Sequence, residues 1–172
     1  MAATATLKQL LAACQRSAWH LEMRDGYTLN DPGLSAWQSG HRIDLDDRSS
    51  WWRPWLQNIV DAVSRGVEVQ RARVVSEPIS PYIQYEYDVT VPNIRAGEHV
   101  RWLPRRKATD LMLPANDFWL FDGSTLLVHY FSGVGDKVGE ELITDPIVVK
   151  QQAEAFEAVW QRATPHEDYR PA

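Results

Sequence analysis

The N-terminal part of the chain shows a helical pattern of apolar residues followed by an alternating one. Residues 6–16 carry apolar side chains three and four positions apart, which predicts a short amphipathic helix. Residues 17–23 alternate between apolar and polar positions, which predicts a strand with Trp19, Leu21 and Met23 on one face. The chain therefore begins with a helix and a strand.

A longer apolar stripe predicts a firm helix over residues 50–65, with Ser49 or Ser50 as its cap. The stripe consists of Trp52, Trp55, Leu56, Ile59, Val60 and Val63. Before it, the Asp, Asn, Gly and Pro content of residues 25–33 predicts a loop. Residues 34–50 are polar and weakly patterned, so we expect a mobile segment there, a candidate lid.

Strand patterns dominate the rest of the chain. A Val-rich strand is predicted over residues 67–76. Residues 80–91 predict a helix, although 87–91 fit a strand equally well, and Pro92 is expected to stop either one. The remaining predictions are strands at 99–103, 118–122, 126–131 and 140–143, a loop at 104–116, and a last helix opening at Asp145-Pro146. This order predicts an α/β fold, a mixed sheet covered by helices.

The length of 172 residues suits a single domain with a real core. Within it we expect residues 1–66 to form an N-terminal extension of helix, strand and helix. Residues 67–165 would form the α/β core, and residues 166–172 a frayed tail.

Charge and composition exclude several classes of protein. A formal net charge of -5 argues against a general nucleic-acid binder. No apolar run is long enough to span a membrane, and the N-terminus lacks the pattern of a signal peptide. Cys14 is the single cysteine, so we expect no internal disulfide and a cytoplasmic protein. Eight tryptophans are many for this length, and we expect several to border a cavity or an interface.

Four segments carry a resemblance to a known family: VQRARVVSEPISPYIQYE, GEHVRWLPR, LPANDFWLFDG and FEAVWQRATP. Over roughly residues 15–165 the chain resembles DUF6879, a family of small actinobacterial proteins of unknown function. The matching motif positions are Arg73, Glu77-Pro78, Tyr82, Gly97-Glu98, Arg101-Trp102, Asp117, Trp119 and Asp122. His20 departs from the family pattern, which has an arginine there. The resemblance implies a neighbour of helix-turn-helix regulators, and hence a regulatory role.

The ending of the chain, FDG, DP and then F-x-x-x-W-x-x-A-x-P, is similar to one half of a phospholipase D-like domain. Active members of that family carry His-x-Lys followed by Asp, where the His is the nucleophile and the Lys binds phosphate. If Asp122 takes the Asp position, Ala115 stands for the His and Asp117 for the Lys. The resemblance implies a phospholipase D-like half-domain with an N-terminal helical extension, and one that lacks phosphodiesterase chemistry.

Eight residues are candidates for a ligand pocket with aromatic walls and charged anchors. They are Arg73, Glu77, Tyr82, Arg101, Trp102, Arg105, Asp117 and Trp119. Arginines can clamp a carboxylate or phosphate, and the segment from Glu77 to Tyr82 lies between a strand end and a helix start, where α/β folds bind ligands. In the structural alternative, one of Arg101, Arg105 and Arg106 pairs with Glu98, Glu77 or Asp117 and the other two are solvated. Arg73 would then pair with Glu77 or Asp117, and Asp122 would cap the turn at Gly123. No metal or cofactor motif occurs in the sequence, so we predict neither.

The sequence favours a non-catalytic module that senses a ligand or contacts a protein, with a helix-turn-helix regulator as partner and a homodimer as assembly. The alternative is a small enzyme of specialised metabolism that uses Glu77, Asp117 or His129 as acid or base on a bound small molecule. A lone strand histidine such as His129 also fits a structural role. Direct DNA binding is a third hypothesis, disfavoured by the charge.

Overall fold

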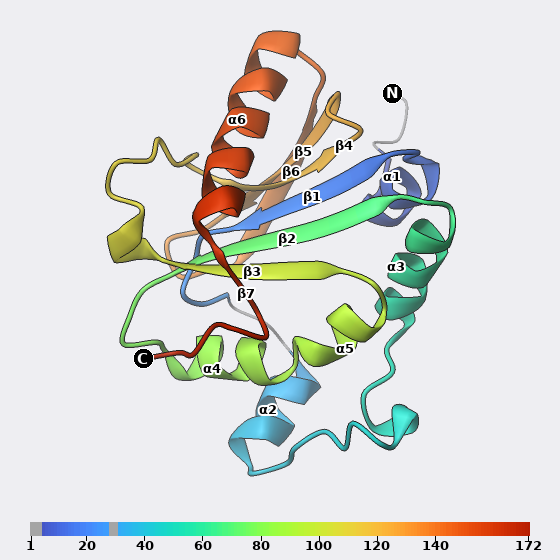
Figure 1. The fold of residues 1–172 in the computed structure, drawn as a ribbon, viewed down its shortest axis with the longest axis vertical. Coiled ribbons are helices and arrows are strands. Elements are labelled where there is room, and N and C mark those ends of the chain that lie inside the picture. Colours follow the sequence, from blue (N-terminus) through green and yellow to red (C-terminus); the bar gives the residue numbers. More distant parts are fainter. Residues whose placement is uncertain (1–4, 28–30) are drawn as a thin grey trace.

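The computed structural model describes residues 5–27 and 31–172, and its centre is a seven-stranded mixed sheet (Figure 1). The strand order is β6-β5-β4-β1-β2-β3-β7. The strands are β1 (Ser17–Glu22), β2 (Glu68–Val75), β3 (His99–Pro104), β4 (Asp117–Phe121), β5 (Thr125–Phe131), β6 (Lys137–Ile143) and β7 (Thr164–Pro165). Neighbours β1, β2 and β3 run parallel, and the other pairs run antiparallel. The predicted mixed α/β sheet is confirmed.

Helices cover both faces of this sheet. They are α1 (Leu7–Ala13), α2 (Pro32–Gln38), α3 (Pro54–Ser64), α4 (Pro81–Asp88), α5 (Val91–Arg95) and α6 (Pro146–Arg162), with short 3-10 turns η1 (Arg48–Ser50) and η2 (Arg105–Lys107). Helix α6 packs on one face, where Phe156 and Val159 join Leu21, Val74 and Phe118 in an apolar core. Helices α1 and α3 cover part of the opposite face, and α4 and α5 lie near β3 (Figure 1).

The face opposite α6 is apolar only in part. Under α1 and α3 it carries Ala18, Val69 and Trp119. Further along the same strands, the alternation places polar residues on this face, beginning with His20 and Glu22. A sheet face that is otherwise buried therefore contains a polar region, and this region holds the candidate site.

Strand β1 lies between β4 and β2, in the middle of the sheet. Residues 1–66, which we expected as an extension, therefore supply a central strand. The contact between α1 and α3 then closes the apolar core on that side of the sheet.

The segment expected to be mobile, residues 34–50, contains most of α2 and the whole of η1. Helix α2 begins at Pro32 within the predicted loop, because Asp31 caps it by accepting a hydrogen bond from the Gly33 N–H. Residues 28–30 of that loop lie outside the described part of the chain.

The helix predicted over residues 50–65 begins later, at Pro54, so a cap at Ser49 or Ser50 is wrong. Proline fits the first helical position and forces the residue before it, Arg53, into an extended conformation. Trp51 and Trp52 therefore precede the helix and are free to line another surface.

The helix predicted over residues 80–91 ends at Asp88, and Pro92 does not stop the chain from turning helical again. Pro92 lies in the first turn of α5, where its missing N–H costs nothing. The strand alternative for residues 87–91 is wrong.

The C-terminal tail is packed rather than frayed. The Tyr169 ring stacks on Trp102 at 5.5 Å, and its hydroxyl donates to a Glu77 carboxylate oxygen at 2.9 Å. His166 is buried and accepts a hydrogen bond from the Trp102 indole. Buried aromatic contacts thus hold residues 166–172 against β3.

Candidate functional site

Four adjacent strands project polar side chains from the same face of the sheet. In the β1–β2 pair, His20 lies beside Arg71 and Glu22 beside Arg73. In the β4–β5 pair, Asp117 lies beside His129. Because each pair shares a face, six ionisable groups converge on one region; these are His20, Glu22, Arg71, Arg73, Asp117 and His129.

An ion network lies at the base of this region. Glu22 accepts hydrogen bonds from Arg71 at 3.1 Å and from Arg73 at 2.6 Å. Arg71 also binds Glu98 at 2.7 Å, and Arg73 also binds Glu86 of α4. Burial opposes ionisation of Glu22, but the two guanidinium groups outweigh it and hold the pKa of Glu22 well below its usual range. The network is therefore charged, and each charge in it has a partner.

A cavity of about 520 Å³ lies over the network; we call it the polar cavity. Its aromatic walls come from the loop after β1 and from α3, α4 and β5, and they are Tyr27, Trp55, Tyr82 and Phe131. The Tyr27 and Phe131 rings lie 5.0 Å apart. Thr90 and Asn93, from the α4–α5 region, complete a lining that is polar at the sheet and aromatic around it.

Asp117 lies at the β4 side of the polar cavity and is almost fully buried. Its carboxylate accepts hydrogen bonds from the Met23 N–H at 2.9 Å and from the Tyr27 hydroxyl. Burial raises the pKa of Asp117 to about 6, with the Glu22 charge adding to the effect and the Tyr27 hydrogen bond opposing it. Asp117 therefore changes protonation close to neutral pH.

Two buried histidines line the polar cavity. The His20 ring stacks on Trp119 at 4.2 Å, and burial lowers its pKa well below the usual value. Burial, with Lys137 adding to it, lowers the pKa of His129 to about 4. Among the described residues, His20 Nδ1 and His129 Nε2 have no hydrogen-bond partner. Each neutral ring thus offers one nitrogen that can donate to or accept from a ligand.

Three of the eight candidate residues line the polar cavity: Arg73, Tyr82 and Asp117. His129, the residue of the enzyme hypothesis, lines it as well. Trp119 lies beneath it, stacked under His20. These residues come from different elements, so the structure brings together positions that are up to 56 residues apart, from Arg73 to His129.

The other four candidates do not line the polar cavity. Arg101 lies on the α6 face and donates to the Trp160 carbonyl at 3.0 Å, because its neighbour Trp102 takes the opposite face beside Arg73. Arg105 donates to the Val74 carbonyl at 3.2 Å. Glu77 binds Tyr169 and Arg106 beside the C-terminal tail.

The sequence reasoning missed Glu22, Arg71 and Glu86. The signal for two of them was present, since His20-Leu21-Glu22 and Arg71-Ala72-Arg73 both place polar residues two positions apart on a strand. One arginine pair of the structural alternative is confirmed, Arg106 with Glu77 at 3.1 Å, but the other expected partners differ. Arg73 pairs with Glu22 and Glu86, while Glu98 pairs with Arg71.

Asp122 has a structural role, but a different one from the predicted cap of the turn at Gly123. Its carboxylate accepts hydrogen bonds from the backbone N–H groups of Gln15, Arg16 and Ser17. It thereby ties the β4–β5 turn to the start of β1. Ala115, at the position that the phospholipase D resemblance assigns to the nucleophile, lines a small cavity beside Asp117.

The mixed sheet and the helices that cover it define the fold class of the protein. The chain is similar to Nuc, a phospholipase D family member from Salmonella typhimurium, with a TM-score of 0.50 and 12% identity over 95% of this chain and 88% of that chain. This likeness confirms a phospholipase D-like fold. TrmBL2, an archaeal chromatin protein, is also similar, with a TM-score of 0.48 and 15% identity over 91% of this chain and 47% of that chain.

Residues 5–171 match the family described as a domain of unknown function, DUF6879, so the chain belongs to this family. No curated protein showed significant sequence similarity to the chain. In the part of the chain that the structure describes, no helix has the length and apolar character needed to cross a membrane.

Proposed function

We propose that this protein is a non-catalytic binding module that takes a small polar ligand into the polar cavity. The observation that carries the proposal is that two cavity-lining histidines, His20 and His129, each hold a buried ring nitrogen with no hydrogen-bond partner among the described residues. The nearest carboxylate oxygens, of Glu22 and Glu140, lie 3.9 Å from His20 Nδ1 and His129 Nε2, beyond hydrogen-bond distance. The His20 and His129 residues are 7% and 8% exposed. A buried polar atom left without a hydrogen bond is costly, so a ligand that supplies the bond gains that free energy on binding.

The absence of catalysis is part of the proposal. At the positions that the resemblance assigns to the phospholipase D nucleophile and phosphate-binding lysine, this chain carries Ala115 and Asp117. Arg71 and Arg73 at the base of the cavity already bind carboxylates, so neither is free to stabilise a transferring phosphate. A polar cavity with paired charges fits recognition better than phosphoryl transfer.

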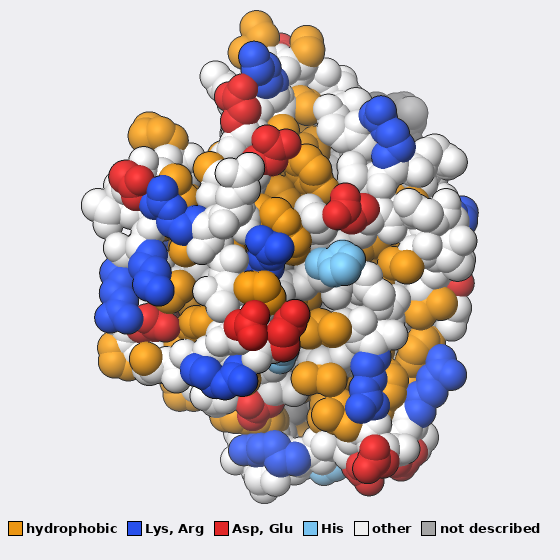
Figure 2. Space-filling model, in the orientation of Figure 1, with side chains coloured by type: hydrophobic (Ala, Val, Ile, Leu, Met, Phe, Trp, Pro, Cys, Tyr) orange, Lys and Arg blue, Asp and Glu red, His pale blue; other side chains and the backbone are white. Residues whose placement is uncertain are grey.

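The partner, the compartment and the assembly of the protein stay predictions. Ligand occupancy would be transmitted to a helix-turn-helix regulator in the cytoplasm, and a homodimer is the expected assembly. Direct nucleic-acid binding remains disfavoured. In the view of Figure 2, basic side chains are interspersed with acidic and apolar ones, unlike the continuous basic surface of a typical DNA binder.

One observation favours the enzyme alternative. Asp117 and His129 are neighbours across the β4–β5 pair, and their pKa values are shifted to about 6 and about 4. Two groups with displaced pKa values beside a cavity are typical of acid–base catalysis. Glu77 has no part in this alternative, because it lies beside the C-terminal tail.

Thermal shift with a panel of free amino acids, nucleosides and sugar acids tests the proposal. His129→Phe removes the free nitrogen but keeps a ring. We expect this variant to lose at least tenfold in affinity for any compound that stabilises the wild type, with no loss of its own stability.

His166→Phe is the matched control, since this buried imidazole already accepts a bond from Trp102. It should lose stability and keep its affinity. Unchanged affinity in His129→Phe would exclude the polar cavity as the site. Chemical conversion of a bound compound, abolished by Asp117→Asn, would establish the enzyme alternative instead.

A further inference from the structure

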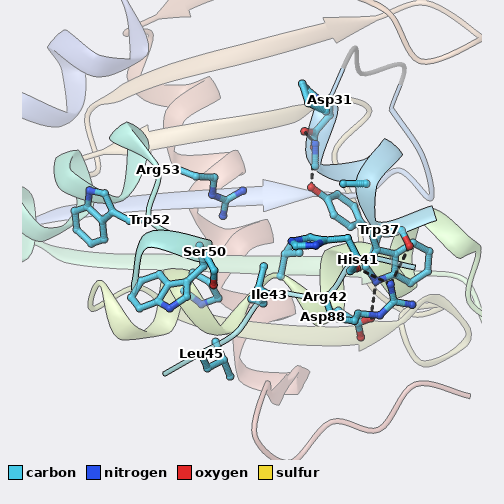
Figure 3. Close-up of a pocket in the computed structure, with 17 residues that line it drawn as sticks. Asp31, Trp37, His41, Arg42, Ile43, Leu45, Ser50, Trp52, Arg53 and Asp88 are labelled. Carbon is cyan, nitrogen blue, oxygen red and sulfur yellow. Dashed lines mark hydrogen bonds and ion pairs between the residues drawn. The ribbon is translucent and has the colours of Figure 1, made fainter. Parts of the chain in front are cut away.

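A second cavity of about 630 Å³ lies between the α2–η1 segment and helices α4 and α5 (Figure 3). We call it the tryptophan groove, because its aromatic walls are Trp37, Trp51, Trp52 and Tyr85. Aliphatic side chains of Ile43 and Leu45 complete the walls. Nothing in the proposed function uses this groove.

Several of these rings are held in place by polar and cation–π contacts. The Trp37 indole donates to Asp88 at 2.8 Å, and the Tyr85 hydroxyl donates to Asp31 at 2.8 Å. Arg48 lies over the Trp52 ring at 3.8 Å. Fixed aromatic walls in a cavity of this size suit a flat, apolar ring system, which can stack on them with little loss of side-chain entropy.

The tryptophan groove and the polar cavity share part of their lining. Asp31, Arg53 and Val89 border both cavities. In Figure 3 the Arg53 side chain extends from the Trp52 side into the space between Trp52 and Asp31. A single elongated ligand can therefore occupy both cavities and pass Arg53 at the junction.

Arg53 differs from the other arginines of the two cavities. Arg71 and Arg73 bind carboxylates, and Arg42 lies 4.0 Å from Asp88. Arg53 donates one hydrogen bond to the Asn93 amide oxygen at 3.1 Å, and no carboxylate of the described residues lies within ion-pair distance of it. Arg53 therefore forms no ion pair with the described residues, although Asp31 borders the same junction, and its guanidinium suits an anionic group.

We infer that the tryptophan groove binds the ring system of an aromatic acid, with the acid group on Arg53. This inference names the class of ligand, and it rests on the proposed function only for the polar extension of that ligand. The ring system lies among the tryptophans, the carboxylate or similar anion pairs with Arg53, and any polar extension reaches the histidines of the polar cavity.

Calorimetric titration with naphthaleneacetate and the matching alcohol, naphthaleneethanol, tests this inference. The two probes share a ring system and differ in charge. At low ionic strength we expect the acid to bind about tenfold more tightly, because charge-assisted hydrogen bonds are stronger than neutral ones. Arg53→Gln should remove this difference and leave the affinity for the alcohol unchanged.

Arg42→Gln is the matched control, since Arg42 lines the same groove but already lies near Asp88. It should preserve the tenfold difference. Arg53→Lys keeps the charge and should retain part of the difference in affinity. It therefore distinguishes the loss of the charge from a general disruption of the fold. Equal affinity of the two probes, failure of both to bind, or a difference that survives Arg53→Gln would overturn the inference.

His129→Phe separates this inference from the proposed function. The probes are too short to depend on His129, so this variant should bind them normally while losing polar compounds. If the probes fail and polar compounds still bind through His129, the groove inference falls and the proposed function stands. If the probes behave as expected and no polar compound binds, the aromatic-acid site stands and the polar cavity is not part of it.

Discussion

Glu22 and Asp117 are two carboxylates on one sheet face whose pKa values move in opposite directions. Two guanidinium groups hold the pKa of Glu22 low despite its burial. Asp117 forms no ion pair with an arginine of the described residues, and the Arg24 charge is a minor influence, so burial raises the pKa of Asp117 to about 6. The residue type alone could not predict this difference, because it depends on which strand lies next to each carboxylate.

We predict that Tyr27→Phe raises the pKa of Asp117 above 6, because the hydroxyl that stabilises the ionised carboxylate is lost. The folded-state pKa already exceeds the ordinary value, so the native state binds this proton more tightly. The contribution of Asp117 to stability therefore falls as pH rises from about 4 to 6, and the variant should extend that fall to higher pH. Carboxyl-carbon NMR titration measures the shift. Tyr82→Phe, whose hydroxyl binds Glu86, should leave Asp117 unchanged.

Glu22→Gln should destabilise the protein by about 3 kcal/mol, because it leaves Arg71 and Arg73 buried with one partner carboxylate fewer. Urea unfolding gives the value. Glu154→Gln is the control, since its pair with Lys150 is exposed and should contribute less than about 1 kcal/mol. Equal losses in the two variants would show that the network is not a buried one.

At the scale of the elements, the alternation of side chains along the strands decides which residues face the site. The sequence predicted β1, β2, β4 and β5 from their apolar patterns, and all four strands exist. It could not predict that β1 and β2 pair in parallel, with Glu22 beside Arg73. The starts of the three helices that begin with or near a proline were also not predicted. Helix α2 begins where the sequence suggests a loop, α3 begins later than its apolar stripe suggests, and α5 begins where Pro92 suggests a stop.

The tie between the β4–β5 turn and β1 depends on Asp122, which also adopts a left-handed conformation with φ 53°. We predict that Asp122→Ala costs about 2–3 kcal/mol, because three N–H groups lose a charged acceptor and alanine tolerates this conformation poorly. Asp122→Asn should cost less, since asparagine keeps an acceptor and tolerates this conformation. Urea unfolding of both variants checks the order, and the reverse order would contradict the role given to Asp122.

At the scale of the whole molecule, the fold is one sheet that the N-terminal residues complete. Strand β1 separates the β6-β5-β4 group from the β2-β3-β7 group. The residues expected as an extension are therefore needed to join the two groups, and the site lies across this junction. The two cavities likewise combine the N-terminal segment with helices from the middle of the chain.

A fragment of residues 67–172 should therefore fail to fold cooperatively, because removing β1 exposes the facing edges of β2 and β4. Circular dichroism melting compares it with the full chain, and added fragment 1–66 should restore a cooperative transition. A cooperative melt of 67–172 alone would show that its sheet does not need β1.

The sequence by itself determined the α/β class, the family and the absence of the phospholipase D nucleophile, because apolar periodicity and motif residues are properties of the local chain. It also supplied Arg73, Tyr82, Asp117 and His129 as candidates. Only the tertiary structure decided which candidates share a cavity, and it added Glu22 and Arg53. A charged residue on a strand has the same local pattern whatever its partner, and its partner is set by strand pairing across many residues of sequence.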